Sequence, residues 1–287
     1  MTKVLGVIGG SGLYQMDALT DVEEVRVDTP FGAPSDALIR GKLGGDPVVF
    51  LPRHGRGHRF TPSEVPYRAN IWALKSLGVD WLLSVSAVGS LREDIVPGHV
   101  VLVDQFIDRT RGRASTFFGD GVVAHVQLGD PVCPVLRGLL REAATDAGAT
   151  LHDGGTYVCM EGPQFSTRAE SQLYRSWGAS VIGMTNVPEC KLAREAELPY
   201  ATLALATDYD CWFEGHDEVS VEAVVKVVKA NVALAQRVIA GLVPRVASCD
   251  VASPAHGALR HAVMTAPDAI PPHARQRLGL LLDPYLG

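Results

Sequence analysis

Residues 3–12 have the sequence KVLGVIGGSG, an apolar run that ends abruptly at Gly9 and Gly10. Such a run followed by glycines is typical of a buried strand that leads into a tight turn. Glycine lets backbone N–H groups approach an anion, and Ser11 adds a hydroxyl donor, so the turn suits phosphate. A purely structural turn and a dinucleotide-binding loop are the alternatives. The second fits poorly, because Gly6 and Gly9 do not have the GxGxxG spacing.

The same alternation of strand and helix recurs along most of the chain. Further strands are predicted at residues 47–51, 81–85, 100–103, 156–159, 180–182 and 200–206. Helices are predicted at residues 67–77, 134–147, 168–177, 188–197 and 220–242, the last with Ser220 as a candidate N-cap. Strands that alternate with helices favour the α/β class. We therefore expect a single domain in which a central mixed, largely parallel β-sheet is flanked by helices.

The chain changes in character near its C-terminus. Residues 1–246 carry the alternating pattern and are expected to form the main folded unit. Residues 247–287 are rich in Ala, Pro and His, and their apolar runs, such as residues 278–282, are short. We expect this segment to be a loosely packed tail or an arm that reaches a neighbouring subunit.

The bulk composition is that of a packed globular protein, and it disfavours several kinds of partner. Of the 287 residues, 47% are hydrophobic and 20% are charged, and the formal net charge is −6. Because no long run of Lys or Arg occurs, we expect neither nucleic acid nor an anionic membrane as a partner. No apolar stretch is expected to approach the roughly 20 residues that span a bilayer.

Cysteine usage and the first residues both favour a cytoplasmic location. The five cysteines form no CxxC motif, and an odd count of this kind is typical of reduced thiols in a cytosolic protein. A partial set of disulfides is the alternative. The opening sequence MTKVLGVIGGSG lacks the layout of a signal peptide.

Three further strand ends offer hydrogen-bond donors: RHGRGH at 53–58, SAVGS at 86–90, and the pair Met184 and Thr185. Arg53 supplies a guanidinium fork that fits phosphate oxygens, and His54 can donate beside it. Each segment also has a purely structural interpretation. Residues 53–58 could be a solvated basic loop, and residues 86–90 could be a turn of small residues. Because open α/β sheets bind ligands at the carboxyl ends of their strands, the four strand ends together predict one phosphate cup.

The strand predicted at 200–206 leads into TDYD, in which Asp208 and Asp210 are two residues apart. In an extended segment such residues face the same way, so both carboxylates can point into one pocket. Two carboxylates near apolar walls raise each other's pKa, which suits a general acid or a grip on an amino group. A helix cap and a metal site are the alternatives, and His216 is the nearby histidine that a metal would need. Phe165, in EGPQFS, can pack on a sugar or a base, although a lone phenylalanine is more often a core residue.

Together these residues resemble the trimeric purine nucleoside phosphorylase family, and most closely its branch that cleaves methylthioadenosine. The resemblance runs from about Val4 to about Leu242. Its motifs are long and stand in order: VIGGSGLY, DTPFGAPSDALI, LPRHGRGH, YRANIWALK, VGSLREDIVPG, DQFIDRT, EGPQFSTRAES, GMTNVPE and TDYDCW. The resemblance implies the nucleoside phosphorylase fold, a catalytic domain at 1–246, and a homotrimer or a dimer of trimers.

The resemblance also implies a role for each matching position. Phosphate would be held by Ser11, Arg53, His54, Ser86, Ala87 and Thr185. The ribose would be lined by Phe165 and Met184, and the base would be faced by Ser166, Asp208 and Asp210. The 5′ pocket would be lined by Val219, Val221, Val224 and, from a neighbouring subunit, His125. Leu281 or Leu282 is a candidate to close that pocket.

The implied reaction is phosphorolysis of a purine nucleoside, with inorganic phosphate as co-substrate and with no metal or redox cofactor. Asp208 would be the acid toward N7 of the base, Asp210 would accept from the 6-amino group, and His54 is the second candidate catalytic residue. Adenine is favoured because the 6-oxopurine branch has Glu and Asn in place of Ser166 and Asp208. The alternatives are a phosphorylase that prefers 6-oxopurine nucleosides such as inosine, and a silent nucleoside-binding or NAD-binding protein. The full set of phosphate donors disfavours the silent binder.

Overall fold

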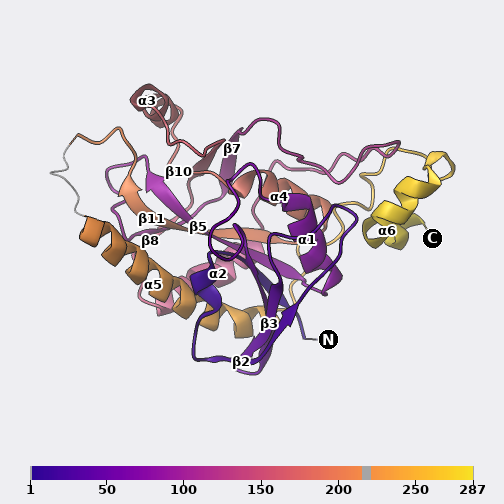
Figure 1. Cartoon of the computed structure of the whole chain (residues 1–287), viewed down its shortest axis with the longest axis horizontal. Coiled ribbons are helices and arrows are strands. Elements are labelled where there is room, and N and C mark those ends of the chain that lie inside the picture. The colour runs from indigo at the N-terminus through magenta and orange to yellow at the C-terminus, as the bar shows by residue number, and fades with distance from the viewer. Residues whose placement is uncertain (1, 215–220, 287) are drawn as a thin grey trace.

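A computed structural model describes residues 2–214 and 221–286, apart from the side chains of Ser11 and of residues 221–226. Among these residues an eleven-stranded sheet forms the centre of the molecule, and helices lie on both of its faces (Figure 1). Val219 and the predicted cap Ser220 lie outside the described residues. The expected α/β single domain is confirmed.

The central strands of the sheet run parallel to one another. The strands are β1 (Leu5–Gly9), β2 (Leu19–Val25), β3 (Leu38–Leu43), β4 (Asp46–Pro52), β5 (Trp81–Ser90), β6 (Val100–Leu102), β7 (Gln105–Arg109), β8 (Leu151–Asp153), β9 (Thr156–Met160), β10 (Val181–Gly183) and β11 (Tyr200–Tyr209). Their order is β2-β3-β4-β1-β5-β10-β9-β7, and β11 pairs with β5 and with β6, which pairs with β8. β1 runs parallel to β4 and β5, β11 runs parallel to β5, and β10 runs antiparallel to β5. The sheet is therefore mixed, with a parallel centre.

The helices divide between the two faces of the sheet. They are α1 (Tyr67–Ser76), α2 (Pro134–Asp146), α3 (Arg168–Ser176), α4 (Asn186–Glu195), α5 (Val221–Ala247) and α6 (Pro272–Leu286), with short 3-10 turns η1 (Ser11–Tyr14) and η2 (Pro267–Ala269). α1 packs with α4, and α2 packs with α5. Leu5 and Val7 of β1 belong to the core beneath α2 and α5, whereas Ile8 belongs to the core beneath α1 and α4. Because side chains alternate along a strand and both faces are covered, the strand is apolar throughout.

Two strands extend further than their sequences suggest. The segment Ser86–Ser90, expected to be a turn, continues β5 and pairs with β10 and β11. β11 likewise continues to Tyr209, so Asp208 lies within a strand and not beyond its end. In both cases pairing with neighbouring strands outweighs the local preference of small and polar residues for a turn.

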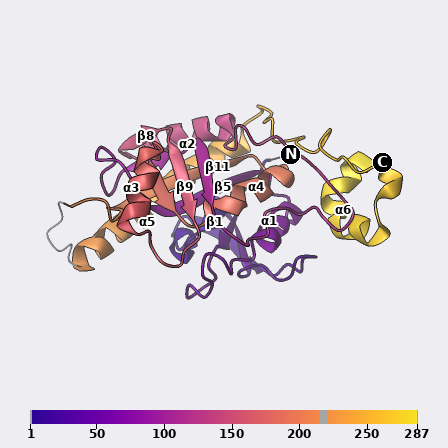
Figure 2. The ribbon, with the colours of Figure 1, turned by 90° about the horizontal axis from the view of Figure 1, so that it is seen from above.

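The C-terminal segment packs on its own chain. Leu278, Leu281 and Leu282 of α6 are buried in the core that also contains α1 and α4. The carboxylate of Glu197 accepts hydrogen bonds from the Leu259 N–H (2.8 Å) and the Tyr285 hydroxyl (2.6 Å). Figure 2 shows α6 and α3 at opposite ends of the molecule. A contact between this segment and a neighbouring subunit stays a prediction.

One helix contains a longer apolar stretch than the sequence analysis predicts. Within α5, the 21 residues Val227–Ala247 are long and apolar enough to cross a membrane, so the expectation that no stretch approaches that length is wrong. Along this helix Val238, Ile239 and Leu242 are fully buried beside α2. Burial of one face accounts for the apolar sequence, as in the core helix of a globular protein.

Candidate active site

Arg53 follows β4 and lies against the ends of two neighbouring strands. Its backbone N–H donates to the carbonyl of Gly9 in β1, at 2.9 Å. Its buried guanidinium forms a bidentate ion pair with Glu189 of α4, through Nε at 2.8 Å and Nη2 at 3.1 Å. Nη1 donates to the Val85 carbonyl (3.0 Å), and Nη2 also donates to the Ser84 hydroxyl (2.6 Å). The guanidinium is thus locked between β4, β5 and α4.

This ion pair corrects the expectation that the fork of Arg53 faces phosphate. A guanidinium has five N–H donors, and among the described residues only Nη1 keeps a hydrogen without an acceptor. Burial alone lowers the pKa of Arg53, but the Glu189 carboxylate outweighs this effect and holds the pKa above its ordinary value. Arg53 therefore stays charged and has one donor left for a ligand.

Ser86 and Thr185 are brought together beside Arg53, through Tyr157. The Tyr157 hydroxyl lies 3.4 Å from Ser86 Oγ and is hydrogen-bonded to the backbone of Thr185. Because β10 runs antiparallel to β5, the chain after Gly183 returns toward the middle of β5. Gly183 has no Cβ, and a Cβ there would overlap the Tyr157 hydroxyl. Ser86 and Thr185 are buried, whereas the neighbouring Ala87 is exposed.

His54 is a neutral hydrogen-bond acceptor in this site. Its Nδ1 lies 2.8 Å from the carbonyl of Phe60, which can only accept, so Nδ1 carries the proton. Burial, together with the Arg53 charge, lowers the pKa of His54 to about 4, although the hydrogen bond to the Phe60 carbonyl opposes the decrease. At neutral pH the free Nε2 therefore accepts a hydrogen bond, and the expectation that His54 donates to phosphate is wrong for the neutral ring.

The remaining predicted phosphate ligand is placed by its backbone alone. Ser11 begins η1 directly after Gly10, and the adjacent Gly9 carbonyl is the one bound by Arg53. The Ser11 side chain is not among the described residues. The ends of β1 and β4, the distal half of β5 and the end of β10 nevertheless meet at one place, as the cup requires.

Asp208 and Asp210 both approach Gly89 of β5. A Cβ at Gly89 would lie 3.3 Å from Asp208 Oδ1 and 3.4 Å from the Asp210 Cβ. A register shift between Ala206 and Asp208 re-aims this end of β11, a common feature beside active sites. The prediction that the two carboxylates share one side of the strand is confirmed.

The two carboxylates have different surroundings. The Thr207 hydroxyl donates to Asp208 Oδ2 at 2.6 Å, and part of the Asp208 side chain is open to solvent. Desolvation by the surrounding protein raises the pKa of Asp208, and the negative charge of Asp210 adds to the increase, which Thr207 opposes. Asp210 is buried, and its Oδ2 has no hydrogen-bond partner in the described part of the chain. A buried oxygen of this kind is poised to accept from a ligand donor.

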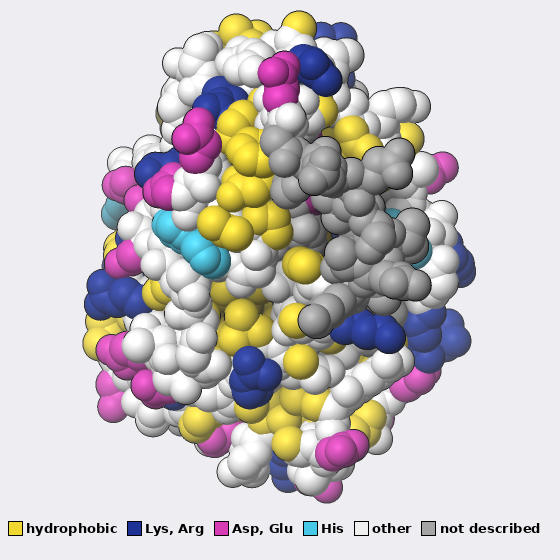
Figure 3. All heavy atoms as spheres, turned by 90° about the vertical axis from the view of Figure 1, so that its left-hand side faces the viewer, with side chains coloured by type: hydrophobic (Ala, Val, Ile, Leu, Met, Phe, Trp, Pro, Cys, Tyr) yellow, Lys and Arg dark blue, Asp and Glu magenta, His cyan; other side chains and the backbone are white. Residues whose placement is uncertain are grey.

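Ser166 lies next to this pair, and Phe165 does not belong to the core. The Ser166 hydroxyl contacts Met160 Sδ at 3.3 Å, and its carbonyl accepts from the Cys211 thiol at 3.3 Å, one residue beyond Asp210. Phe165 is 81% exposed, which excludes the core alternative. Apolar side chains gather on the face of the molecule that carries α3 and the end of β11 (Figure 3).

Most of the side chains predicted to line the 5′ pocket lie outside the described part of the chain. His125 is exposed, and its N–H donates to the Ala262 carbonyl of the C-terminal segment at 2.8 Å. Val221 and Val224 lie in the first turns of α5, and their side chains are not described, while Val219 is outside the described residues. Leu281 and Leu282, the candidates to close the pocket, are 3% and 0% exposed in their own chain's core, so neither is free to line it.

Glu189 and Tyr157 were missed by sequence reasoning. Glu189 lies in the motif GMTNVPE, 136 residues from its partner Arg53, and Tyr157 lies 71 residues from Ser86. A lone Glu or Tyr carries no sequence signal for a buried partner so far away.

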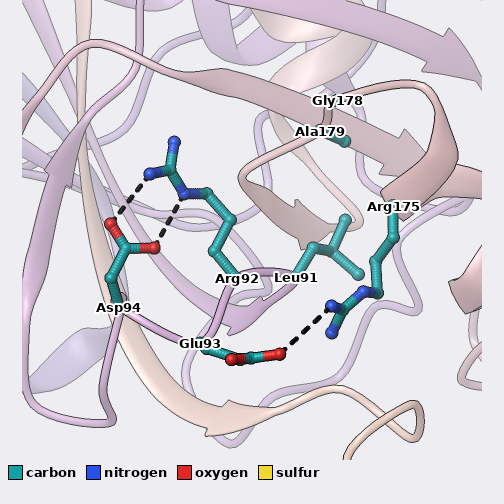
Figure 4. A pocket seen from close by; sticks show the side chains of 7 residues that line it. All are labelled: Leu91, Arg92, Glu93, Asp94, Arg175, Gly178 and Ala179. Atoms are coloured by element: carbon teal, nitrogen blue, oxygen red, sulfur yellow. Dashed lines mark hydrogen bonds and ion pairs between the residues drawn. The ribbon is translucent and has the colours of Figure 1, made fainter.

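Two cavities among the described residues contain none of the predicted site residues. The smaller, of about 300 Å³, is lined by Leu91, Arg92, Glu93, Asp94, Arg175, Gly178 and Ala179 (Figure 4). Figure 4 shows that its charges are paired, Arg92 with Asp94 at 2.8 Å and Arg175 with Glu93 at 3.7 Å. Paired charges leave no excess charge for an ionic ligand. The larger cavity, of about 570 Å³, lies around Asp104, Cys133 and Ser253.

We next consider whether the described residues could bind a metal ion or form disulfides. Residues 2–214 and 221–286 contain no group of three or more His, Cys, Asp or Glu that could hold a metal ion. The acidic pair therefore lacks a third metal ligand there. All five cysteines are free, and only Cys211 among them is exposed.

The ends of β1, β4 and β10 and the distal half of β5 thus meet beside an acidic pair in a mixed α/β sheet, an arrangement that suits the phosphorylase chemistry expected from the sequence. The family model of the phosphorylase superfamily matches residues 4–244. The chain therefore belongs to the phosphorylase superfamily.

Within this superfamily, the chain is similar in sequence and structure to methylthioadenosine phosphorylases. The chain is 60% identical to an S-methyl-5′-thioadenosine phosphorylase of Geobacter sulfurreducens, over 100% of both chains. It is 52% identical to a solved methylthioadenosine phosphorylase from an antarctic soil metagenomic library, with a TM-score of 0.95 over 98% of this chain and 99% of that one. A methylthioadenosine phosphorylase of Schistosoma mansoni, solved with adenine, is 39% identical, with a TM-score of 0.81 over 87% and 93% of the two chains. The nucleoside phosphorylase fold is thereby confirmed.

Proposed function

We propose that the chain cleaves S-methyl-5′-thioadenosine with inorganic phosphate, giving adenine and 5-methylthio-α-D-ribose 1-phosphate. The observation that carries the proposal is the acidic pair over Gly89, with Ser166 beside it. Relatives of this chain at 60% and 61% identity over their full length are named S-methyl-5′-thioadenosine phosphorylases, which supports the same substrate here. The reaction would return adenine and the sugar phosphate to purine and methionine salvage.

Asp208 and Asp210 divide the work on the base. The raised pKa of Asp208 favours its protonated form, which can donate to N7 as the glycosidic bond breaks. The unpaired Oδ2 of Asp210 can accept from the 6-amino group. General acid assistance of this kind contributes about 10²–10⁴-fold in rate. A 6-oxopurine offers no amino hydrogen at that position, so a buried acceptor would be left unpaired.

Phosphate would be bound by the cup formed by Ser11, Arg53, His54, Ser86, Ala87 and Thr185. Arg53 and Thr185 supply donors, and neutral His54 accepts the hydrogen of a protonated phosphate oxygen through Nε2. This hydrogen bond leaves more negative charge on the phosphate oxygens, which makes the phosphate a better nucleophile. Phosphate then attacks C1′ from the face opposite the departing adenine, with inversion. Alignment of the two reactants contributes at most about 7–11 kcal/mol.

The 5′ pocket would be completed by a neighbouring subunit in a homotrimer or a dimer of trimers. Val219, Val221 and Val224 would line it from one chain, and the exposed His125 would reach it from the next. No cofactor beyond the co-substrate phosphate is proposed, and the location would be the cytoplasm. Joint refolding of His125→Ala and Asp208→Asn chains tests the shared site. Mixed trimers should recover activity that neither variant has alone, and a mixture no better than its parts contradicts the shared site.

One assay tests the reaction itself. The protein is mixed with methylthioadenosine, adenosine, inosine and methylthioinosine, each with and without phosphate, and the released base is identified. Adenine release that requires phosphate is the expected result, fastest from methylthioadenosine. Hypoxanthine as the fastest product would favour the 6-oxopurine alternative. Release that ignores phosphate would point to a hydrolase.

A further inference from the structure

Arg113 is a buried arginine to which the mechanism above assigns no role. It lies in the connection between β7 and α2, and its side chain is 2% exposed. Its guanidinium faces two segments that carry predicted site residues. One contains Met184 and Thr185, and the other contains Phe165 and Ser166.

Arg113 fixes the first segment through backbone carbonyls. Nη1 donates to the carbonyls of Met184 (2.7 Å) and Val187 (3.0 Å), which flank Thr185. Val187 has non-helical backbone angles, φ −120° and ψ 125°, so regular helical hydrogen bonds are interrupted at this start of α4. Buried carbonyls without a helical partner need another donor, and Arg113 supplies it.

Arg113 fixes the second segment through Glu161. Nη2 donates to the Glu161 carbonyl at 2.5 Å, and Nε contacts the Glu161 carboxylate at 3.4 Å. The following Gly162 has φ +69°, and a Cβ there would collide with Met184 Sδ, so the two segments touch. One guanidinium therefore spans the gap across which Met184 and Phe165 would hold the sugar.

We propose that Arg113 is a positioning residue that sets the spacing of these two segments and so the fit of the ribose and its 5′ group. The proposal rests on the proposed function. The planar fork of arginine spreads five donors over a wider span than the compact ammonium of lysine, so it can bridge three separate carbonyls. The phosphate cup has supports besides Arg113, because Glu189 holds Arg53, and the Tyr157 hydroxyl contacts both Ser86 and the Thr185 backbone. Loss of Arg113 should therefore affect the nucleoside more than phosphate.

The test measures both substrates on the folded fraction of each variant. For Arg113→Met we expect kcat/KM for methylthioadenosine to fall on the order of 10²-fold, the loss that a misplacement of about 1 Å can cause. The KM for the nucleoside should rise while the KM for phosphate changes little. Arg113→Lys should be intermediate, because its compact ammonium restores the charge and three donors but not the span of the guanidinium. Glu161→Gln should stay close to wild type, because the Glu161 carbonyl and the other two acceptors are kept.

Arg137→Met is the matched control. Arg137 also bonds a carbonyl, that of Leu102 at 3.3 Å, and a carboxylate, that of Asp153, but it lies on α2 across the sheet. It should lose stability and keep normal values of KM. Arg113→Met with wild-type kcat/KM per folded molecule would overturn the proposal, as would equal changes in both KM values. Glu161→Gln as damaging as Arg113→Met would overturn the carbonyl account. A wild-type protein without phosphate-dependent release would instead refute the proposed function.

Discussion

At the scale of single residues, the site depends on groups that are unfavourable in isolation. Asp208 sits where desolvation raises its pKa, and Asp210 has a buried oxygen without a partner among the described residues. Carboxylates with a raised pKa and unpaired buried acceptors are costly, and they concentrate at functional sites. The acidic pair does not stabilise the fold, so we explain its presence by the binding of a ligand.

The first prediction concerns base selection by Asp208. Asp208→Asn removes the proton donor to N7, so turnover of methylthioadenosine should fall by about 10²–10⁴-fold. Turnover of methylthioinosine should fall less, because an asparagine can pair with a 6-oxopurine. Steady-state kinetics on the two substrates gives the ratio. Equal losses on both would show that Asp208 is structural.

The second prediction concerns the stability of the same variant. A raised pKa in the folded state means that Asp208 favours folding below its ordinary value of 3.8 and that this contribution is lost as pH rises through the folded-state pKa. Asp208→Asn removes the charged form, so its melting temperature should exceed that of the wild type at neutral pH. The difference should vanish below about pH 4. Melting curves recorded across this range are the measurement, and a variant less stable at neutral pH would contradict the direction of the shift.

Single residues also mark the limit of what the sequence predicts. The roles of Arg53, His54 and Asp208 follow from their motifs, but the orientation of Arg53 and the tautomer of His54 do not. Both depend on partners placed by the fold, Glu189 for Arg53 and the Phe60 carbonyl for His54. Such partners are set by tertiary packing, and motif spacing carries no record of them.

At the scale of elements, long periodic segments were predictable and short or paired ones were not. The buried strands and the amphipathic helices follow from their periodicity. The hairpin of β2 and β3 was missed because β2 is mostly exposed and polar, and α6 was missed because its leucines reveal a buried face only once packed. The distal half of β5 was missed because small residues there suit a turn until β10 and β11 supply pairing partners.

The third prediction concerns the contact between β9 and β10. Gly183→Ala would drive a methyl group into the Tyr157 hydroxyl, which contacts Ser86 and the Thr185 backbone. We expect a loss of about 1–3 kcal/mol in stability from overpacking, together with a rise in the KM for phosphate. The double variant with Tyr157→Phe removes the clashing oxygen and should recover part of the stability. No recovery would show that the hydroxyl is not the obstacle.

At the scale of the whole molecule, the C-terminal segment is part of the fold. Its buried apolar side chains are Cys249, Ala255, Leu259, Ala262, Ile270, Ala274, Leu278, Leu281 and Leu282. Full burial of one Leu or Ile stabilises a protein by about 1.5–3 kcal/mol, and the net stability of a domain is only about 5–15 kcal/mol. The free energy gained by burying these side chains is therefore comparable to the net stability of the whole chain.

The fourth prediction follows from that comparison. Leu278→Ala should lower the free energy of unfolding by about 2–5 kcal/mol, and a chain that ends at residue 246 should be largely insoluble. Denaturant unfolding and soluble yield are the measurements. Arg260→Ala, an exposed change in the same segment, is the control and should have little effect. A stable, active chain of 246 residues would show that the segment is an independent arm.

The one exposed thiol gives the molecule a built-in reporter. Cys211 lies beside Asp210 and contacts the Ser166 backbone, while the other four cysteines are buried. A maleimide dye should therefore label this position without any engineering of the chain. Burial and the charge of Asp210 raise the pKa of the thiol, which slows the labelling. Adenine should slow it further by covering the sulfur, so the labelling rate can serve as a direct titration of base binding.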